Sequence, residues 1–212
     1  MFVVLFLGIV LIACGGGSDS SDGGNSTPGT DEATGNCGPT GSKIASIQRD
    51  QLRRFTAGPE QVTDKTKTYI ATIVTSKGDI VFEMVAADVP LTVNSFVFLS
   101  CHGFYDGLTF HRVVPEFVVQ GGCPEGSGRG GPGYRFEDEP VQGEYTVGSV
   151  AMANAGPDTN GSQFFICIDD CRSKLTPNYN LFGHVVEGLD IAQQVEVGDV
   201  MKSVVVEERP KA

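Results

Sequence analysis

Apolar residues occur along the chain in short runs that predict many strands. Two of these runs, 69–76 and 79–85, are separated only by Lys77 and Gly78, which predicts a tight hairpin. Later strands are expected around Phe110 and Val118 and over residues 147–153, 163–168, 181–186 and 203–208. Many short strands with few helices favour a mainly β fold that closes into an antiparallel barrel.

Two segments show helical signals instead. Pro90 is placed to begin the first helix, because proline is favoured at the first helical position. Val93, Phe96 and Val97 then fall on one face of it, which we expect to plug one end of the barrel. Residues 189–195 predict a second, shorter helix.

The first residues predict an export signal. Residues 2–13 form an apolar run that is short for a membrane span, and it ends in small residues just before Cys14. The sequence Leu-Ile-Ala-Cys resembles the lipobox of bacterial lipoproteins, in which the cysteine becomes the lipidated first residue of the mature protein. This resemblance implies a signal peptide over 1–14, lipidation of Cys14, and a membrane-anchored extracytoplasmic location in the periplasm or at the cell surface. An uncleaved signal anchor is the alternative, and a start upstream of Met1 would explain why no Lys or Arg precedes the run.

Two further segments separate this signal from the first strand. Residues 15–42 are rich in Gly, Ser, Asp and Thr, and they predict a flexible tether because they cannot bury enough apolar surface to offset their ordering entropy. Residues 43–67 form a connector that begins with a short amphipathic helix over 43–55. That helix either packs on the folded domain or lies on an anionic membrane beside the lipid anchor. The folded domain is expected over 68–209.

The charge of the chain limits the classes of partner. The net charge is −11, and most of the acidic excess lies from Lys67 onward. A nucleic-acid-binding protein would normally present a basic face, so this class is excluded. An acidic, solvated surface that aids solubility is the expected role of these charges.

The cysteines and histidines do not predict a metal site. Their spacing includes no C-x-x-C, the chain has three histidines, and we expect neither a metal nor another cofactor. If Cys14 is lipidated, five cysteines remain, and outside the cytoplasm some of them can pair. The pairing is left open by the sequence. The five are Cys37, Cys101, Cys123, Cys167 and Cys171.

A glycine-rich loop between 121 and 133 contains a pattern that could be mistaken for a nucleotide site. Residues 126–131 satisfy G-x-G-x-x-G, the dinucleotide fingerprint. That fingerprint requires a helix to begin there, so that its N-terminus holds the pyrophosphate. Pro132 and Gly133 follow instead, which indicates a surface loop.

One arginine stands in the middle of an apolar, strand-forming run. The run is Phe-His-Arg-Val-Val-Pro-Glu-Phe-Val-Val-Gln-Gly-Gly over residues 110–122, and Arg112 is its third residue. Burying a guanidinium group is costly unless its donors are satisfied, so a structural ion pair is one explanation. A second run, Ser-Val-Ala-Met-Ala-Asn-Ala-Gly-Pro-Asp-Thr-Asn-Gly-Ser-Gln-Phe-Phe-Ile over 149–166, supplies amides and phenylalanines but no obviously placed carboxylate. A functional role for Arg112 is therefore favoured.

Together the two runs resemble the cyclophilins, the cyclosporin-binding family of peptidyl-prolyl cis-trans isomerases. Each run matches one of the family's core motifs, in the same order, and the resemblance extends from about Thr68 to Arg209. It implies an eight-stranded antiparallel β-barrel capped by two α-helices, and an enzyme that accelerates isomerisation of X-Pro bonds in exported proteins and so assists their folding. A proline-peptide binding module or chaperone without catalysis, or a surface lipoprotein for adhesion or structure, is the alternative.

The resemblance also implies which residues form the site. Arg112 would be the catalytic residue that stabilises the twisted amide, and Gln120 would orient it. His111 is expected at the edge of the pocket, because the reaction moves no proton. The remaining substrate-binding residues form the proline pocket or line the peptide groove, and they are Phe117, Val118, Ala153, Asn154, Ala155, Gln163, Phe165, Leu175 and Tyr179.

One departure from the family concerns drug binding. Some members carry a Trp immediately before the position of Leu175, and this chain has Lys174 there. Because that Trp helps to hold cyclosporin, we expect weak cyclosporin binding with catalysis retained. The expected partners are proline-containing peptides, unfolded exported proteins and the membrane that holds the anchor, and the protein is expected to be a monomer.

Overall fold

The computed structural model describes residues 54–210, all within the compact unit that spans Glu32–Ala212. The expected signal over 1–14, the tether over 15–42 and nearly all of the amphipathic helix lie outside the described residues. Arg54 and Phe55, at the end of that expected helix, are not helical. Within 54–210, no helix is both long and apolar enough to cross a membrane.

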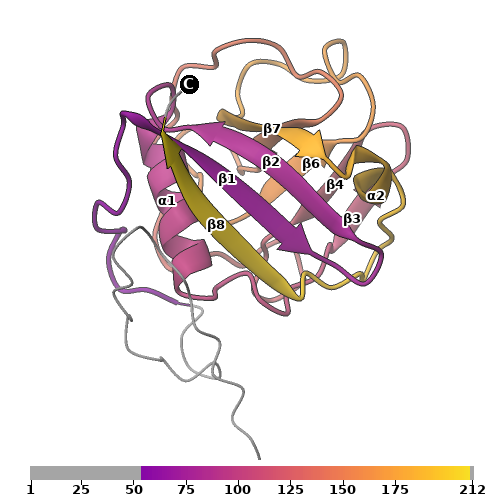
Figure 1. The fold of residues 1–212 in the computed structure, drawn as a ribbon, viewed down its shortest axis with the longest axis horizontal. Coiled ribbons are helices and arrows are strands. Elements are labelled where there is room, and N and C mark those ends of the chain that lie inside the picture. Colours follow the sequence, from indigo (N-terminus) through magenta and orange to yellow (C-terminus); the bar gives the residue numbers. More distant parts are fainter. Residues whose placement is uncertain (1–53, 211–212) are drawn as a thin grey trace, which may run out of the picture. The chain divides into compact units, whose positions relative to one another are not determined.

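Eight antiparallel strands form a single sheet, as the sequence pattern predicts. Every pair of neighbouring strands is antiparallel, and the order across the sheet is β3-β4-β6-β5-β7-β2-β1-β8 (Figure 1). In chain order the strands are β1 (Lys67–Val74), β2 (Asp79–Val85), β3 (Arg112–Val114), β4 (Val118–Gly121), β5 (Ser149–Met152), β6 (Phe164–Cys167), β7 (Leu181–Glu187) and β8 (Ser203–Pro210).

The closed barrel that we expected is not established by strand pairing. The strands β3 and β8 are the two edges of the sheet and share no ladder of hydrogen bonds. The segments that precede these edge strands approach each other instead. Thr109 and Val200 form an isolated antiparallel bridge, and Met201 N donates to Leu108 O at 2.8 Å. The contact between the edges is therefore made by loop backbone.

The helix α1 (Pro90–Cys101) begins at the proline that the sequence marks, and its N-terminus is capped from a distant part of the chain. Its N-cap residue offers no side-chain hydrogen bond. The carboxylate of Glu139 accepts from Leu91 N at 2.9 Å and from Thr92 N at 2.8 Å instead. A negative charge at this end satisfies free N–H groups and opposes the positive end of the helix dipole. The second helix, α2 (Leu189–Gln193), lies on the opposite side of the view in Figure 1.

The sheet separates two apolar clusters. The larger is the inner core, where Phe82, Phe96 and Phe164 are almost completely buried. The smaller, which we call the outer cluster, contains six buried residues. They are Val118, Tyr145, Ala151, Phe165, Cys167 and Cys171. Because side chains alternate along a strand, Phe164 on β6 enters the inner core while Phe165 enters the outer cluster.

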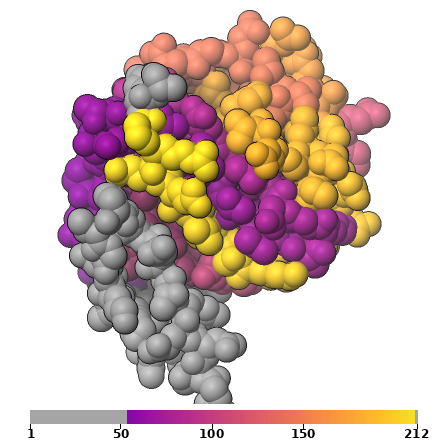
Figure 2. Space-filling view, viewed as in Figure 1, coloured from indigo at the N-terminus to yellow at the C-terminus, as the bar shows by residue number. Residues whose placement is uncertain are grey.

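The segment before β1 runs beside α1 as an ordered strap. Asn94 on α1 accepts hydrogen bonds from Val62 N and Thr63 N, at 2.8 and 3.1 Å, and donates to Glu60 O at 2.8 Å. The Phe55 ring lies edge-on to that of Phe98, with 5.1 Å between the ring centroids. Figure 2 shows the yellow surface of β8 bordered by indigo residues from this N-terminal part of the described chain.

Candidate active site

The hairpin of β3 and β4 places Arg112 beside Gln120. These two residues are directly opposite in the register of the strands. Arg112 Nη1 consequently donates to Gln120 Oε1 at 3.3 Å. The Arg112 side chain is exposed and forms no ion pair with any of the described carboxylates. The structural ion pair considered as an explanation for this arginine is therefore not found among residues 54–210.

The next strand extends this pair into a row across the sheet. Gln120 on β4 pairs in register with Phe165 on β6, and Phe165 pairs with Ala151 on β5. Residues opposite each other in antiparallel strands project from the same face. The guanidinium group of Arg112, the amide of Gln120 and the ring of Phe165 are thus held side by side by backbone pairing.

The apolar part of the site is the rim of the outer cluster. Phe165 and Val118 are 5% and 2% exposed, whereas the predicted pocket residues Phe117, Leu175 and Tyr179 are half-buried and pack against them. The Tyr179 ring lies edge-on to Phe165, with 5.6 Å between the centroids. A partly exposed aromatic and aliphatic surface of this kind can receive a small apolar ring from a ligand.

The loop that carries Leu175 is fixed by the contacts of Lys174 and by a backbone hydrogen bond. Lys174 Nζ donates to Glu116 O and forms an ion pair with Asp169 at 3.0 Å, and it lies 5.9 Å from the centroid of the Phe117 ring. Leu175 N donates to Cys171 O at 2.9 Å. Lys174 therefore occupies the edge of the apolar rim, at the position where some cyclophilins have Trp.

Gln163 connects the row of Arg112, Gln120 and Phe165 to the glycine-rich loop. Gln120 Nε2 donates to Gln163 Oε1 at 3.0 Å, and Gln163 Nε2 donates in turn to Gly128 O and Gly130 O, each at 2.9 Å. This chain of amides leads from Arg112 through Gln120 to the loop. It fixes the orientation of both glutamine amides, because each has its oxygen accepting and its nitrogen donating a hydrogen bond.

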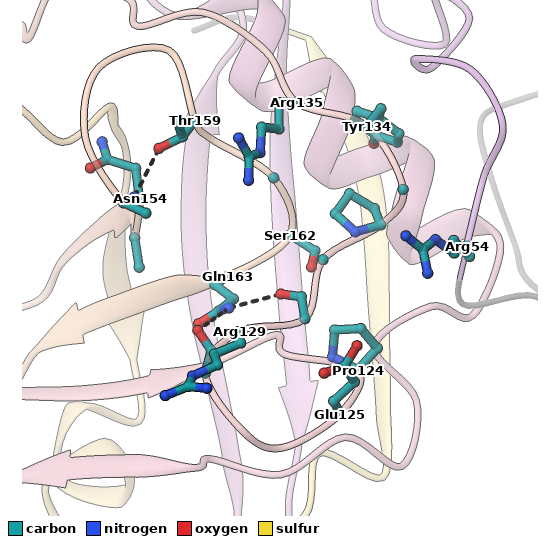
Figure 3. A pocket seen from close by; sticks show the side chains of 18 of the residues that line it. Arg54, Pro124, Glu125, Arg129, Tyr134, Arg135, Asn154, Thr159, Ser162 and Gln163 are labelled. Atoms are coloured by element: carbon teal, nitrogen blue, oxygen red, sulfur yellow. Dashed lines mark hydrogen bonds between the residues drawn. The ribbon is translucent and has the colours of Figure 1, made fainter.

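Gln120 and Gln163 also line a cavity of about 1020 Å³, which Figure 3 shows from close by. It is lined in part by Ala153, Asn154 and Ala155, which were predicted to bind the peptide. Asn154 Nδ2 donates to Asn178 O at 2.9 Å, and Ala155 N donates to Thr159 Oγ1 at 2.8 Å. Ala153 also packs against the outer cluster, so it adjoins both the apolar rim and the cavity.

His111 lies beside the glycine-rich loop, at the edge of the row. Neither ring nitrogen makes a hydrogen bond of good geometry, although the Gln163 amide lies near the ring. Burial lowers the pKa of His111; the nearby Gln163 amide opposes this effect, and the positive charge of Arg112 adds to it. The ring is therefore neutral at neutral pH and carries no charge.

The cysteines of the described region differ in state. Cys101 is disulfide-bonded, whereas Cys123, Cys167 and Cys171 are free and buried. The thiols of Cys167 and Cys171 contact each other within the outer cluster, and burial raises the pKa of both. Cys14 and Cys37 lie outside the described residues. No group of three or more His, Cys, Asp and Glu side chains within residues 54–210 is placed to hold a metal ion.

Sequence reasoning missed several residues that line the cavity. These are three arginines, Arg54, Arg129 and Arg135, together with Tyr134 and Thr159. Arg129 belongs to the loop that was assigned only to the surface, and Arg54 to the expected amphipathic helix. No local pattern marks them, because they come from separate segments that only the fold brings together.

The family is decided by comparison with known proteins. The model of the cyclophilin-type peptidyl-prolyl cis-trans isomerases matches residues 70–212. The chain belongs to this family. A peptidyl-prolyl cis-trans isomerase of Helicobacter pylori is 46% identical over 160 residues, which cover 74% of this chain and 96% of that protein. Peptidyl-prolyl cis-trans isomerase B of Bacillus subtilis is 49% identical over 128 residues, which cover 59% of this chain and 89% of the relative.

The fold agrees with this assignment. The crystal structure of a cyclophilin-type isomerase from Cryptosporidium parvum superimposes with a TM-score of 0.62 at 31% identity, covering 68% of this chain and 99% of the other. A second structure of that isomerase, determined in the presence of the dipeptide Ala-Pro, gives a TM-score of 0.61 at 31% identity and covers 66% of this chain and 99% of the other. The chain is a cyclophilin and a peptidyl-prolyl isomerase.

Proposed function

We propose that this cyclophilin isomerises X-Pro bonds through Arg112, with the rim of the outer cluster holding the proline ring. The observation that carries the proposal is the row formed by Arg112, Gln120 and Phe165 on three neighbouring strands. It sets a permanent positive charge beside a partly exposed apolar surface, which would hold the pyrrolidine ring. The Ala-Pro dipeptide used with the Cryptosporidium isomerase supports a ligand of this class.

The chemistry required is the stabilisation of a twisted amide. The barrier to rotation, about 18–20 kcal/mol, reflects the loss of C–N double-bond character. Twisting leaves a more basic nitrogen, so a donor near that nitrogen binds the twisted state more tightly than either planar state. Arg112 suits this role because its donors are rigid and permanently charged, and Gln120 holds one of them by a hydrogen bond.

The test measures isomerisation on the full-length chain in detergent solution. The exchange between cis and trans forms of a blocked Ala-Ala-Pro-Phe peptide is followed by NMR, with the wild type and with Arg112→Ala. We expect acceleration by the wild type and a loss of about 10²–10³-fold in kcat for the variant, the usual effect of removing one donor to a transition state. Arg209→Ala is the matched control, because Arg209 is also exposed and lies on β8.

Three results would decide between the alternatives. Full activity in Arg209→Ala together with the loss in Arg112→Ala supports the proposal. Equal activity in all three proteins would exclude Arg112 as the catalytic residue. A wild type that binds the peptide without accelerating its exchange would make the chain a proline-peptide binding module.

We further propose that the enzyme acts outside the cytoplasm as a monomer on a lipid anchor, and assists the folding of exported proteins. The apolar run that ends at Cys14 and the polar tether over 15–42 support this. Slow X-Pro isomerisation can limit folding, so an exported isomerase has an evident use. Mass spectrometry of the N-terminal peptide from membranes should find a lipid on Cys14, and Cys14→Ser should abolish it. A soluble, unmodified wild type would overturn the anchor.

A further inference from the structure

The cavity beside the catalytic row has a basic lining on an otherwise acidic protein. The net charge of the chain is −11, yet the charged side chains that line the cavity are Arg54, Arg129, Arg135 and a single acid, Glu125. In Figure 3 the three guanidinium groups lie on three different sides of the cavity. The carboxylate of Glu125 accepts from Ser127 Oγ at 3.3 Å. The cavity therefore carries an excess of positive charge.

These arginines differ in their partners from Arg172 and Arg209, two other exposed arginines of the domain. Arg172 forms ion pairs with Asp170 at 2.7 Å and Glu144 at 3.5 Å, and Arg209 pairs with Glu207 at 3.2 Å. By contrast, Arg54, Arg129 and Arg135 have no carboxylate partner within residues 54–210. Structural arginines on this surface are neutralised, whereas those at the cavity keep their donors available.

Arg54 is brought to the cavity by the strap before β1, which precedes the part of the chain that the family model matches. Phe55 N donates to Pro132 O at 2.6 Å, and the Phe55 ring packs against Phe98 and Tyr134. A side chain at Gly133 would collide with the Phe55 carbonyl oxygen, so the close approach requires glycine. The position of Arg54 is thus built by specific contacts of this chain.

Arg129 is held by the site itself. It lies between Gly128 and Gly130, whose carbonyl oxygens both accept from Gln163. Gln163 also accepts from Gln120, the partner of Arg112. Any peptide that lies along this row from the proline rim passes next to the loop that carries Arg129. The cavity is therefore a continuation of the peptide groove.

We propose that this cavity is a subsite for a carboxylate side chain, so that the preferred substrates are X-Pro segments with Asp or Glu near the proline. Guanidinium groups bind carboxylates through paired hydrogen bonds, and three of them line this cavity beside a single acid, Glu125. The proposal rests on the proposed isomerase function and names the class of peptide which that site takes.

The expected effect is on binding and not on the rotation step. The carboxylate is bound equally in the planar and twisted states, because it lies away from the reacting bond, so it lowers KM and leaves kcat unchanged. Exposed ion pairs contribute little individually, and three arginines together predict a preference of about three- to tenfold. Because the pairs are exposed, salt at about 0.5 M should remove most of it.

The experiment uses the full-length chain and two pairs of blocked peptides. Acetyl-Ala-Glu-Ala-Pro-Phe-amide is compared with its Gln counterpart, and acetyl-Ala-Ala-Pro-Phe-Glu-amide with its Gln counterpart. Dissociation constants come from NMR titration of the arginine Nε–H signals, and kcat and KM from cis–trans exchange. One of the two Glu peptides should bind about three- to tenfold more tightly than its Gln partner at low salt, with the same kcat.

Matched variants assign the effect to the cavity. The triple variant with Arg54→Gln, Arg129→Gln and Arg135→Gln should abolish the preference while retaining kcat on the Gln peptides. Lys202→Gln removes the same charge from an exposed residue that does not line the cavity, and it should keep the preference. Phe55→Ala should weaken the preference by displacing Arg54. A preference that survives in the triple arginine variant would overturn the proposal.

The results distinguish a wrong subsite proposal from a wrong proposal of isomerase function. A wild type that accelerates all four peptides with equal KM within both pairs overturns the subsite and leaves the function intact. A wild type that accelerates none overturns the proposed function, and the titration still reports whether the Glu peptides bind more tightly at the arginines. A higher affinity for the Gln peptides would exclude an acidic subsite.

Discussion

The two faces of β4 and β6 use the same kinds of residue for different purposes. Facing inward, Val119, Phe164 and Ile166 are 0% exposed and belong to the inner core. Facing outward, Val118 and Phe165 are also buried, but the surrounding rim is half-buried and Arg112 and Gln120 adjoin it. Apolar character therefore does not distinguish the core from the site. The outward face differs from the core because side chains cover it incompletely and because Arg112 places a charge at its edge.

The largest effects should come from truncating the two neighbouring phenylalanines. Phe164→Ala is expected to lower the free energy of unfolding by about 3–5 kcal/mol, because it leaves a cavity in a sealed core. Phe165→Ala should lower the free energy of unfolding by less, because neighbouring side chains can move into the space. It should raise KM by about tenfold or more, because the substrate proline ring loses its apolar contact with Phe165. Urea unfolding and peptide exchange measure the two quantities. An unchanged KM in Phe165→Ala would contradict the division of the faces.

A smaller effect should follow from changing the edge of the rim. Lys174 is bound to Glu116 and Asp169 and lies 5.9 Å from the centroid of the Phe117 ring, so it adds charge at the position where the family resemblance implies an apolar contact with cyclosporin. We expect weak cyclosporin binding by the wild type and about tenfold tighter binding by Lys174→Trp, because an indole adds a large apolar surface.

The measurement is direct, because the chain contains no other Trp and the new indole reports binding by fluorescence. The wild type is titrated by calorimetry. Lys202→Trp, remote from the rim, should not tighten binding. Tight binding by the wild type would show that Trp is not needed at this position.

The smallest effect concerns His111 and pH. Burial lowers the pKa of this histidine in the folded state, so between that value and about 6.5 the unfolded chain binds more protons. Stability should consequently fall as the pH is lowered below about 6.5, and His111→Gln should reduce the slope of this fall. His184→Gln, on the exposed side of β7, serves as the control.

Unfolding in urea at several pH values between about 5 and 7.5 measures this slope. Catalysis by the folded enzyme should not depend on the charge of His111, since rotation about the X-Pro bond moves no proton. A pH–rate profile that His111→Gln alters strongly would assign this residue a direct part in the reaction.

The local pattern of residues was sufficient to predict the strands and helices of the domain. The alternation of apolar residues located the strands, Pro90 located the start of α1, and the two motifs identified Arg112, Gln120 and Phe165. These features depend on near neighbours in the chain, on the periodicity of side chains and on motif spacing. The same pattern also favoured a closed barrel, which strand pairing does not establish, because the meeting of the edges depends on loops far apart in sequence.

Only the tertiary structure decided which distant residues meet. It placed Glu139 on the N-terminus of α1, connected Gln163 to the glycine-rich loop, and gathered Arg54, Arg129 and Arg135 around one cavity. An ion pair or a cavity lining has no period along the chain, because its members are chosen by packing and not by spacing. The sequence by itself therefore determined the family and the motifs that contain Arg112, Gln120 and Phe165, and the fold decided the charge of the cavity beside them.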